Sequence, residues 1–313
     1  MFIMRQIKFY CTLLSSFLVF NLSSAMAADN KNCQFTEQES LHIQQAAHTL
    51  PHQLIKPLEI SRHDQAYCLQ SSFIQALINQ QPGLQPAGYK IAFTHEKVQK
   101  MFATSEPAHA VIFAQQFLPS GSKIATNFAV NPMYEADLVV EIKSAQIMRA
   151  KTHLQMLEHI RYLYPAFELV TLPFNMQNKK IREQISANQL IAHNIMSVNF
   201  VLGEQITVEP SSDFARKLGN TRILVTDENN ELIQTADTES IMRHPLNALA
   251  WLIEKFNQQG LSLKAGDRIS LGSLGKLRPV ENANKQIRYQ FVNWLEQPQV
   301  TMSFVANTKP ETK

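Results

Sequence analysis

The N-terminal segment limits which part of this chain can belong to a folded core. Arg5 and Lys8 precede an apolar run, Phe9–Phe20, and small residues follow at the Ala-Met-Ala sequence of positions 25–27. A basic start, a short apolar run and a small-residue site are typical of a cleavable secretory signal. We therefore expect cleavage after Ala27, and a secreted or periplasmic protein. The alternative is an uncleaved anchor, for which the apolar run is short.

Removal of residues 1–27 would leave two cysteines, Cys33 and Cys68. Two thiols in an oxidising compartment favour one disulfide, and their spacing matches no metal-binding motif. The bridge would join the N-terminal segment to the next helix. Two separate buried thiols are the alternative.

Composition excludes several classes of protein. The 313 residues are 45% hydrophobic and 18% charged, which suits a folded chain rather than a disordered one. The net charge is only +3, and no basic block is present, so we expect no nucleic-acid partner. After the N-terminal segment no apolar stretch is long enough for a membrane helix, so we expect no stable membrane insertion after cleavage.

Apolar periodicity and turn residues predict the elements. Helices are expected at 36–48, 62–80, 95–103, 152–163 and 244–260. Strands are expected at 88–94, 135–142, 167–172, 198–202, 222–226, 231–235, 268–271 and 276–280, with two more between 288 and 305. This order predicts one α+β fold, with a signal at 1–27, a helical segment at 28–84 and a β-rich domain at 85–313.

Three carboxylates could meet at a cation. Glu135 and Asp137 are two residues apart on a predicted strand, so their side chains share one face. Glu168 lies within another apolar strand. Like charges in apolar surroundings are costly unless a cation lies between them, and hard divalent cations prefer oxygen ligands. The alternatives are a solvated polar face for the pair and a solvent-facing edge position for Glu168.

Two further positions could contact an anionic substrate. Lys90 shares its strand face with the small residues Gly88, Ala92 and Thr94, which leaves room for a ligand beside the ammonium group. Ser273 lies between two glycines in a predicted turn, where the backbone can approach a carboxylate closely. A surface lysine on an edge strand is the alternative for Lys90.

Six segments together resemble one family of enzymes. They are GYKIAFTHEKVQKMF, YEADLVVEI, AFELV, HNIMSVNFVLGE, HPLNALAWL and LKAGDRISLGSL, in this order along residues 38–305. The chain thereby resembles the 2-keto-4-pentenoate hydratase / 4-oxalocrotonate decarboxylase family of the fumarylacetoacetate hydrolase superfamily. The resemblance implies a mixed β-sandwich roll with an N-terminal helical segment, and homo-oligomers.

The same resemblance implies a site and a reaction. It implies Mg²⁺ or Mn²⁺ held by Glu135, Asp137 and Glu168, with Lys90 as an active-site lysine and Ser273 as a contact of the substrate carboxylate. The implied activity is that of a carbon–oxygen lyase, a hydratase that adds water to a 2-hydroxy-2,4-dienoate to give a 4-hydroxy-2-oxo acid. A related decarboxylase or C–C hydrolase is a variant of this prediction.

The chain departs from the family pattern at several positions. Asp137 is one methylene shorter than the glutamate of the family, and Ala108 replaces an acidic residue that follows a proline. His109 could take over the proton transfer, or could be structural. His193 and Leu271 also replace the aspartate and the threonine of the family. A second hypothesis is therefore a weakened, exported relative that binds a small carboxylic acid without turnover.

Overall fold

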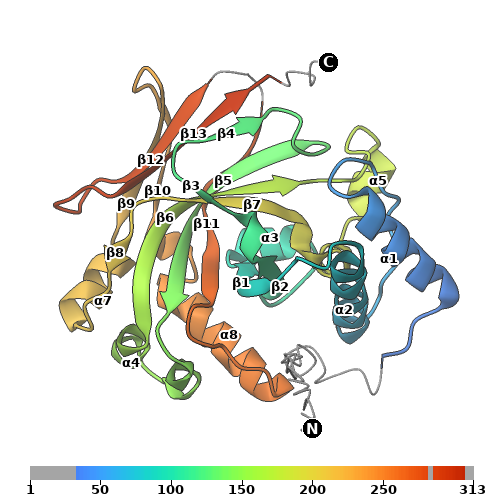
Figure 1. Ribbon diagram of the computed structural model, residues 1–313, viewed down its shortest axis with the longest axis horizontal. Coiled ribbons are helices and arrows are strands. Elements are labelled where there is room, and N and C mark those ends of the chain that lie inside the picture. The colour runs from blue at the N-terminus through green and yellow to red at the C-terminus, as the bar shows by residue number, and fades with distance from the viewer. Residues whose placement is uncertain (1–32, 281–284, 307–313) are drawn as a thin grey trace, which may run out of the picture.

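Two β-sheets packed together form the body of the protein, with helices grouped at one side and along one end (Figure 1). The computed structural model describes residues 33–280 and 285–306. The long sheet has eight strands in the order β2-β1-β11-β5-β6-β7-β3, with β8 paired to β6. The second sheet has five strands in the order β10-β9-β12-β13-β4. The α+β fold predicted from the sequence is confirmed.

The long sheet contains β1 (Pro86–Ala92), β2 (Ala108–Phe113), β3 (Phe117–Pro119), β5 (Pro132–Ile142), β6 (Ile160–Thr171), β7 (Ser197–Leu202), β8 (Ile206–Thr207) and β11 (Arg268–Pro279). The second sheet contains β4 (Ser122–Ala125), β9 (Arg222–Asp227), β10 (Leu232–Asp237), β12 (Gln286–Phe291) and β13 (Gln299–Val305). The α-helices are α1 (Glu37–Thr49), α2 (His63–Gln80), α3 (Glu96–Met101), α4 (His153–Glu158), α5 (Lys179–Gln184), α6 (Ala187–Ala192), α7 (Ser212–Gly219) and α8 (Pro245–Gln259). Short 3-10 turns are η2 (Ala114–Gln116), η3 (Ala145–Arg149), η4 (Asn194–Met196) and η5 (Thr238–Ser240).

The two faces of the long sheet have different surroundings. Ala136, Leu138 and Val140 of β5 belong to the main apolar core, together with side chains of the second sheet and of α8. The alternate residues of β5 project to the other face, where Glu135 and Asp137 lie. Alternation along one strand therefore separates the apolar core from a polar site.

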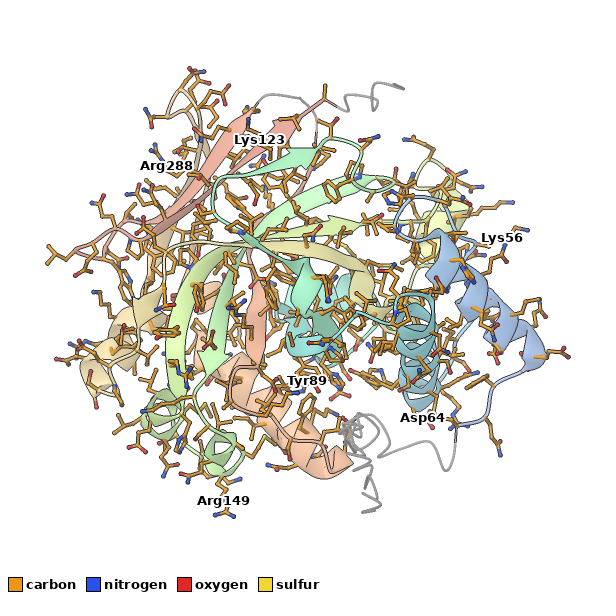
Figure 2. The ribbon with its side chains drawn as sticks, viewed as in Figure 1. Lys56, Asp64, Tyr89, Lys123, Arg149 and Arg288 are labelled. Carbon is orange, nitrogen blue, oxygen red and sulfur yellow. A yellow bond between two sulfur atoms is a disulfide. The ribbon has the colours of Figure 1, made fainter. Side chains whose placement is uncertain are left out.

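Charged side chains lie mostly at the periphery. Figure 2 shows Lys56, Lys123, Arg149 and Arg288 at the rim of the molecule, whereas Tyr89 lies among the elements inside. Among the described residues, the buried charged side chains are Lys90, Asp137, Glu141, Glu168, Asp227 and Asp267. Three of these six lie together on the polar face of the long sheet. Buried charges are rare unless they are paired, so this concentration indicates a site.

Side chains close the outer edge of β2. The backbone N–H of His109 donates to the Tyr67 hydroxyl at 3.0 Å, and its carbonyl accepts from Gln70 at 2.9 Å. The side-chain amide of Asn194 bonds to both the N–H and the carbonyl of Val111, at 2.8 Å each. A free strand edge exposes unpaired backbone groups. Here α2 and η4 satisfy those groups and are fixed against the sheet.

Most of the predicted elements are present, but the strands β2, β3, β4 and β8 were not predicted, and there are three further differences. The helix expected at 152–163 ends at Glu158, and the chain enters β6 at Ile160. The strands expected at 268–271 and 276–280 are one strand, β11, so the glycine-serine segment is not a turn. The sequence interpretation did not include α5, α6 or α7, which are only six to eight residues long. Short helices carry little periodicity, because one or two turns show few repeats.

The helix α1 begins at the capping box that the sequence predicts. The Thr36 hydroxyl accepts from the Glu39 N–H, and the Glu39 carboxylate accepts from the Thr36 N–H. None of the helices within residues 33–280 and 285–306 combines the length and apolar character of a transmembrane segment. The predicted signal at 1–27 lies outside the described residues.

The predicted disulfide between Cys33 and Cys68 is present. It links the segment before α1 to the second turn of α2, across 35 positions of sequence. A crosslink of this loop size restricts the unfolded chain and stabilises the folded state by about 3–4 kcal/mol in the chain-entropy model.

We predict that the Cys33→Ser/Cys68→Ser variant loses about 3 kcal/mol of unfolding free energy relative to the wild type. Urea titration followed by circular dichroism measures the difference. Dithiothreitol should lower the stability of the wild type and leave that of the variant unchanged. Equal stabilities of the oxidised wild type and the variant would contradict the prediction.

Candidate active site

Three carboxylates converge because β5 and β6 pair in one register. Glu135 lies directly opposite Glu168, and Asp137 lies opposite Ala166 on the same ladder. One oxygen from each of Glu135, Asp137 and Glu168 lies within 4.8 Å of the others. Because β6 is an interior strand between β5 and β7, the solvent-edge alternative for Glu168 is wrong. The group could hold a metal ion, as the sequence pattern suggests.

Lys90 reaches this group from β1. Its Nζ atom lies 2.5 Å from Glu168 Oε1, and the two side chains are only 5% and 1% exposed. The parallel strand β11 brings Ser270 opposite Lys90. That approach requires Gly88, because a Cβ at this position would lie 1.8 Å from the Arg268 carbonyl oxygen. The surface alternative for Lys90 is therefore wrong, and the lysine is part of a buried ion pair.

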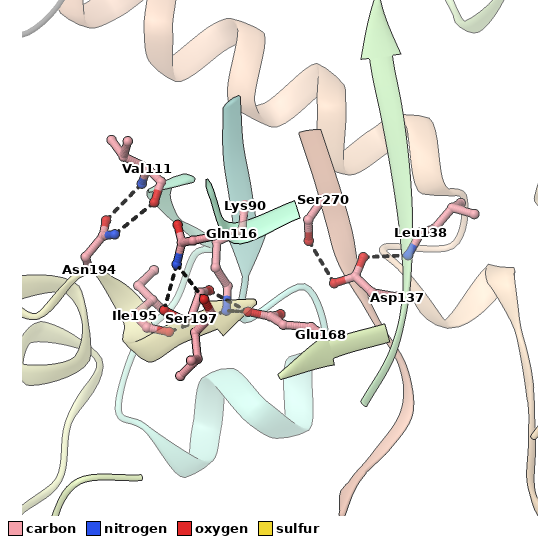
Figure 3. Close-up of polar contacts among 11 residues, drawn as sticks. Lys90, Val111, Gln116, Asp137, Leu138, Glu168, Asn194, Ile195, Ser197 and Ser270 are labelled. Atoms are coloured by element: carbon pink, nitrogen blue, oxygen red, sulfur yellow. Dashed lines mark hydrogen bonds and ion pairs between the residues drawn. The ribbon is translucent and has the colours of Figure 1, made fainter. Parts of the chain in front are cut away.

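An irregularity in β11 directs two serines to the same site. Ser270 pairs with Val139 and Ser273 with Asp137, so β11 contains one residue more than β5 between these pairs. Gly272 has a φ of 118° there, and a Cβ on it would lie 2.6 Å from Thr94 Oγ1. Ser270 donates to Asp137 Oδ2 at 2.7 Å, and the Ser273 hydroxyl bonds to Glu135. Figure 3 shows the Ser270–Asp137 contact beside Lys90 and Glu168.

The group carries an excess of negative charge. Three ionised carboxylates and one ammonium group leave a net charge of −2. Burial and then the charge of Glu168 raise the pKa of Glu135 to about 8. The same two causes, in the same order, raise the pKa of Asp137 to about 7. A bound divalent cation would neutralise the excess negative charge. It would thereby lower the pKa of both carboxyl groups, which would then be ionised.

The segment after α6 supplies two more polar contacts. The Ser197 hydroxyl donates to Glu168 Oε1 at 2.5 Å, and the Ile195 carbonyl accepts from Lys90 Nζ at 3.4 Å (Figure 3). The sequence interpretation assigned no role to Ser197, Ser270 or Ile195. The hydroxyls lie in segments quoted for the family resemblance, but a backbone carbonyl leaves no mark in the sequence.

Three consecutive residues in this segment have left-handed backbone angles. Asn194, Ile195 and Met196 have φ values of 55°, 49° and 59°. Asparagine tolerates this conformation, but a β-branched residue such as isoleucine rarely adopts it. The cost is roughly 1–2 kcal/mol per residue, and such strain persists only where the surroundings enforce it.

Comparisons with known proteins agree with this geometry. The chain is 25% identical over 203 residues to the 2-keto-4-pentenoate hydratase of Burkholderia vietnamiensis, covering 64% of this chain and 72% of the relative. It is 23% identical over 228 residues to 2-keto-4-pentenoate hydratase 1 of Dechloromonas aromatica, covering 73% and 82%. The 4-oxalocrotonate decarboxylase of Pseudomonas putida G7, solved with magnesium and adipate, superposes with a TM-score of 0.72 at 18% identity, over 88% of this chain and all of that one. No family model matches the chain.

The chain is thus similar in sequence to 2-keto-4-pentenoate hydratases and in fold to a 4-oxalocrotonate decarboxylase, which supports the resemblance that the sequence motifs indicate. The mixed roll that the resemblance implies is confirmed as the fold, because the decarboxylase superposes on 88% of the chain. Of the predicted site residues, the structure brings together Glu135, Asp137, Glu168, Lys90 and Ser273. Their roles in metal and substrate binding remain predictions.

His109 is the predicted residue that does not join this group. It lies opposite Ile91 on the β1–β2 ladder, whereas Ala110 lies opposite Lys90, so the His109 ring projects to the other face of the sheet. There it stacks on Tyr67 and contacts Phe256. Gln259 lies nearby, but neither ring nitrogen has a hydrogen-bond partner of acceptable geometry. The geometry gives no support to the prediction that His109 transfers a proton.

Ala108 occupies the position of the acidic residue found in the family. It is fully buried and belongs to an apolar cluster with the N-terminal helices and Met196. Apart from His109, β2 contains no titratable side chain.

We predict that Lys90→Met destabilises the metal-free protein by about 3–5 kcal/mol, because it leaves Glu168 buried without its cation. Urea unfolding in EDTA at pH 7 measures the loss. Glu168→Gln in the Lys90→Met background should recover part of it, since the double variant no longer buries an ionised carboxylate at position 168 without its lysine. Lys179→Met, which breaks an exposed pair, should change the stability by less than about 0.5 kcal/mol. A similarly small effect of Lys90→Met would contradict the ion pair.

A second prediction concerns pH. Burial lowers the pKa of His109 to about 3 in the folded state, below its ordinary value of 6.5. The folded protein therefore binds fewer protons than the unfolded chain, and the stability contributed by neutral His109 is lost as the pH falls below about 6.5. The loss for this residue reaches about 3 kcal/mol at pH 4.

His109→Phe should therefore reduce the loss of stability between pH 7 and pH 4, because phenylalanine binds no proton and leaves no hydrogen bond broken. Denaturant titrations at several pH values give the slope for both proteins. Parallel slopes in the wild type and in His109→Phe would show that this histidine is not buried in its neutral form.

Proposed function

We propose that this protein is a divalent-metal-dependent hydratase that acts on 2-hydroxy-2,4-dienoates or related small 2-oxo acids. The observation that carries the proposal is the convergence of three carboxylates from β5 and β6 beside one buried lysine. The two curated relatives are named as hydratases, and they match 203 and 228 residues of the chain.

The donor set fits Mg²⁺ or Mn²⁺. Glu135, Asp137 and Glu168 offer only oxygen ligands, which hard divalent cations prefer, and the net charge of −2 matches one such ion. The neighbouring decarboxylase contains magnesium in its crystal structure. A bound cation would stabilise the negative charge that develops on the substrate oxygen during ketonisation.

The protein's own groups would bind and orient the substrate. Lys90 has three N–H donors, and two of them have acceptors in Glu168 and the Ile195 carbonyl. The third donor can bind a substrate oxygen or hold the proton that moves between oxygen and carbon. The Ser273 hydroxyl, which bonds to Glu135 in this structure, would donate to the substrate carboxylate in place of Glu135.

A second candidate function is binding without turnover. It is favoured by the buried alanine at position 108, which removes one acid/base group, and by the position of His109 on the other face. Asp137 adds a shorter carboxylate at the metal. A related decarboxylase or C–C hydrolase is the third possibility, because the structural neighbour is itself a decarboxylase.

An assay of 2-hydroxypenta-2,4-dienoate turnover tests the proposal. The loss of the ultraviolet absorbance of the dienoate measures the rate. We expect turnover in Mg²⁺ or Mn²⁺ and its loss in EDTA. Glu135→Gln should weaken Mn²⁺ binding by at least about tenfold, since it removes a charged ligand. Glu141→Gln is the matched control, because Glu141 lies on the same strand but contacts Arg161 and Arg268 instead of the cluster.

The outcomes separate the hypotheses. If the protein binds the metal and the dienoate but the absorbance of the dienoate does not change, the hypothesis of binding without turnover is supported. Formation of carbon dioxide from a 2-oxo diacid would support the decarboxylase. Unchanged Mn²⁺ affinity in Glu135→Gln would eliminate the proposed metal site under every one of these functions.

We also propose that the protein works outside the cytoplasm. The disulfide between Cys33 and Cys68 supports this location, because such bonds persist in oxidising compartments. Mass spectrometry of the protein purified from its native host should give a chain that starts at residue 28. A mature chain that retains residues 1–27 would contradict the proposal.

A further inference from the structure

The left-handed turn Asn194–Met196 connects the edge of the sheet to the ion pair. At its start, the Asn194 amide bonds to both backbone groups of Val111 on β2. In its middle, the Ile195 carbonyl accepts from Lys90 Nζ, and directly after it Ser197 donates to Glu168. One short segment thus contacts both members of the buried pair (Figure 3).

We infer that Asn194 is a positioning residue: its amide holds the strained turn against β2, so that the Ile195 carbonyl and the Ser197 hydroxyl orient Lys90 and Glu168. The Asn194 side chain hydrogen-bonds to Val111 and to neither of these two side chains. The inference rests on the proposed function only in giving the ion pair a catalytic role.

The conformation of Ile195 is the reason that a clamp is needed. A β-branched residue at a φ of 49° prefers to return to the right-handed or extended region, and the preceding and following residues are left-handed as well. The Asn194 amide, with one acceptor and two donors, can satisfy both Val111 groups at once. Alanine at 194 would leave both groups without this partner and release the turn.

The flanks of the turn are fixed independently. Before it, the ring of His193 bonds to the Gln189 carbonyl at 2.7 Å and to His42 at 3.2 Å. After it, Gln116 Nε2 donates to the carbonyls of Ser197 and Val198 at 3.0 Å each. Loss of the Asn194 clamp should therefore change the three residues of the turn without unfolding the elements on either side.

The test compares Asn194→Ala with Asn199→Ala in the full chain. Asn199 is the matched control. It lies in β7, the strand that follows the turn, and its side-chain amide also donates to a backbone carbonyl, that of Gln116. We expect Asn194→Ala to lower kcat by about 10- to 100-fold, with KM for the dienoate and the Kd for Mn²⁺ changed less than about threefold. Asn199→Ala should leave kcat within about threefold of the wild type.

If Asn194 only stabilised the fold, a second substitution that relieves the strain of the turn would not restore activity. Ile195→Gly in the Asn194→Ala background should recover part of kcat, since glycine adopts the left-handed conformation without strain. The ¹⁵N signal of the Lys90 ammonium group, observed in ¹⁵N-lysine-labelled metal-free protein, should shift or broaden in Asn194→Ala and stay unchanged in Asn199→Ala.

Failure of this inference differs from failure of the proposed function. A wild type without turnover would refute the hydratase, and the ammonium signal would then still test the clamp. A wild-type Lys90 signal in Asn194→Ala, or a kcat equal to that of the wild type, would overturn the positioning role. An equal loss of kcat in Asn194→Ala and Asn199→Ala, without recovery by Ile195→Gly, would also overturn it.

Discussion

Two buried carboxylates, a third that is partly buried and one ammonium group lie together on one face of the long sheet, and the surrounding structure has to compensate their charge. The Lys90–Glu168 contact satisfies one carboxylate, and the hydroxyls of Ser197, Ser270 and Ser273 provide further donors. These donors cannot neutralise the remaining charge. The sheet therefore presents a site whose electrostatics are completed by a cation, and the other features of the fold serve to hold its groups in place.

Backbone geometry places those groups. Gly88 allows β1 to approach β11, which brings Lys90 into the site, and Gly272 permits the irregular pairing that turns both serines inward. The turn at Asn194–Met196 adds contacts from a third direction. Each of these features uses a backbone position that most residues cannot adopt. The site thus depends on local exceptions to regular strand geometry.

The sequence predicts the parts of the site that follow strand periodicity. The two-residue spacing of Glu135 and Asp137 was sufficient to place them on one face. The apolar neighbours of Glu168 and the small neighbours of Lys90 marked these two residues as candidates, and the family resemblance added their roles. The sequence did not reveal the extra residue in β11, since a glycine-serine segment also suits a turn. His109 shows the opposite difficulty: a pKa suited to proton transfer says nothing of which face a side chain occupies, and the register with Ile91 directs it away. Short helices such as α6 were missed for lack of repeats.

The closed edge of β2 has a consequence for how copies of the protein could associate. Tyr67, Gln70 and Asn194 occupy the backbone groups that an incoming strand would need. Two molecules that met at this side would touch through the outer surfaces of helices rather than through a shared ladder. Any continuous intermolecular sheet would have to begin at a strand other than β2. The end of the sheet formed by β2 and β1, which carries Lys90, would then lie outside such a contact.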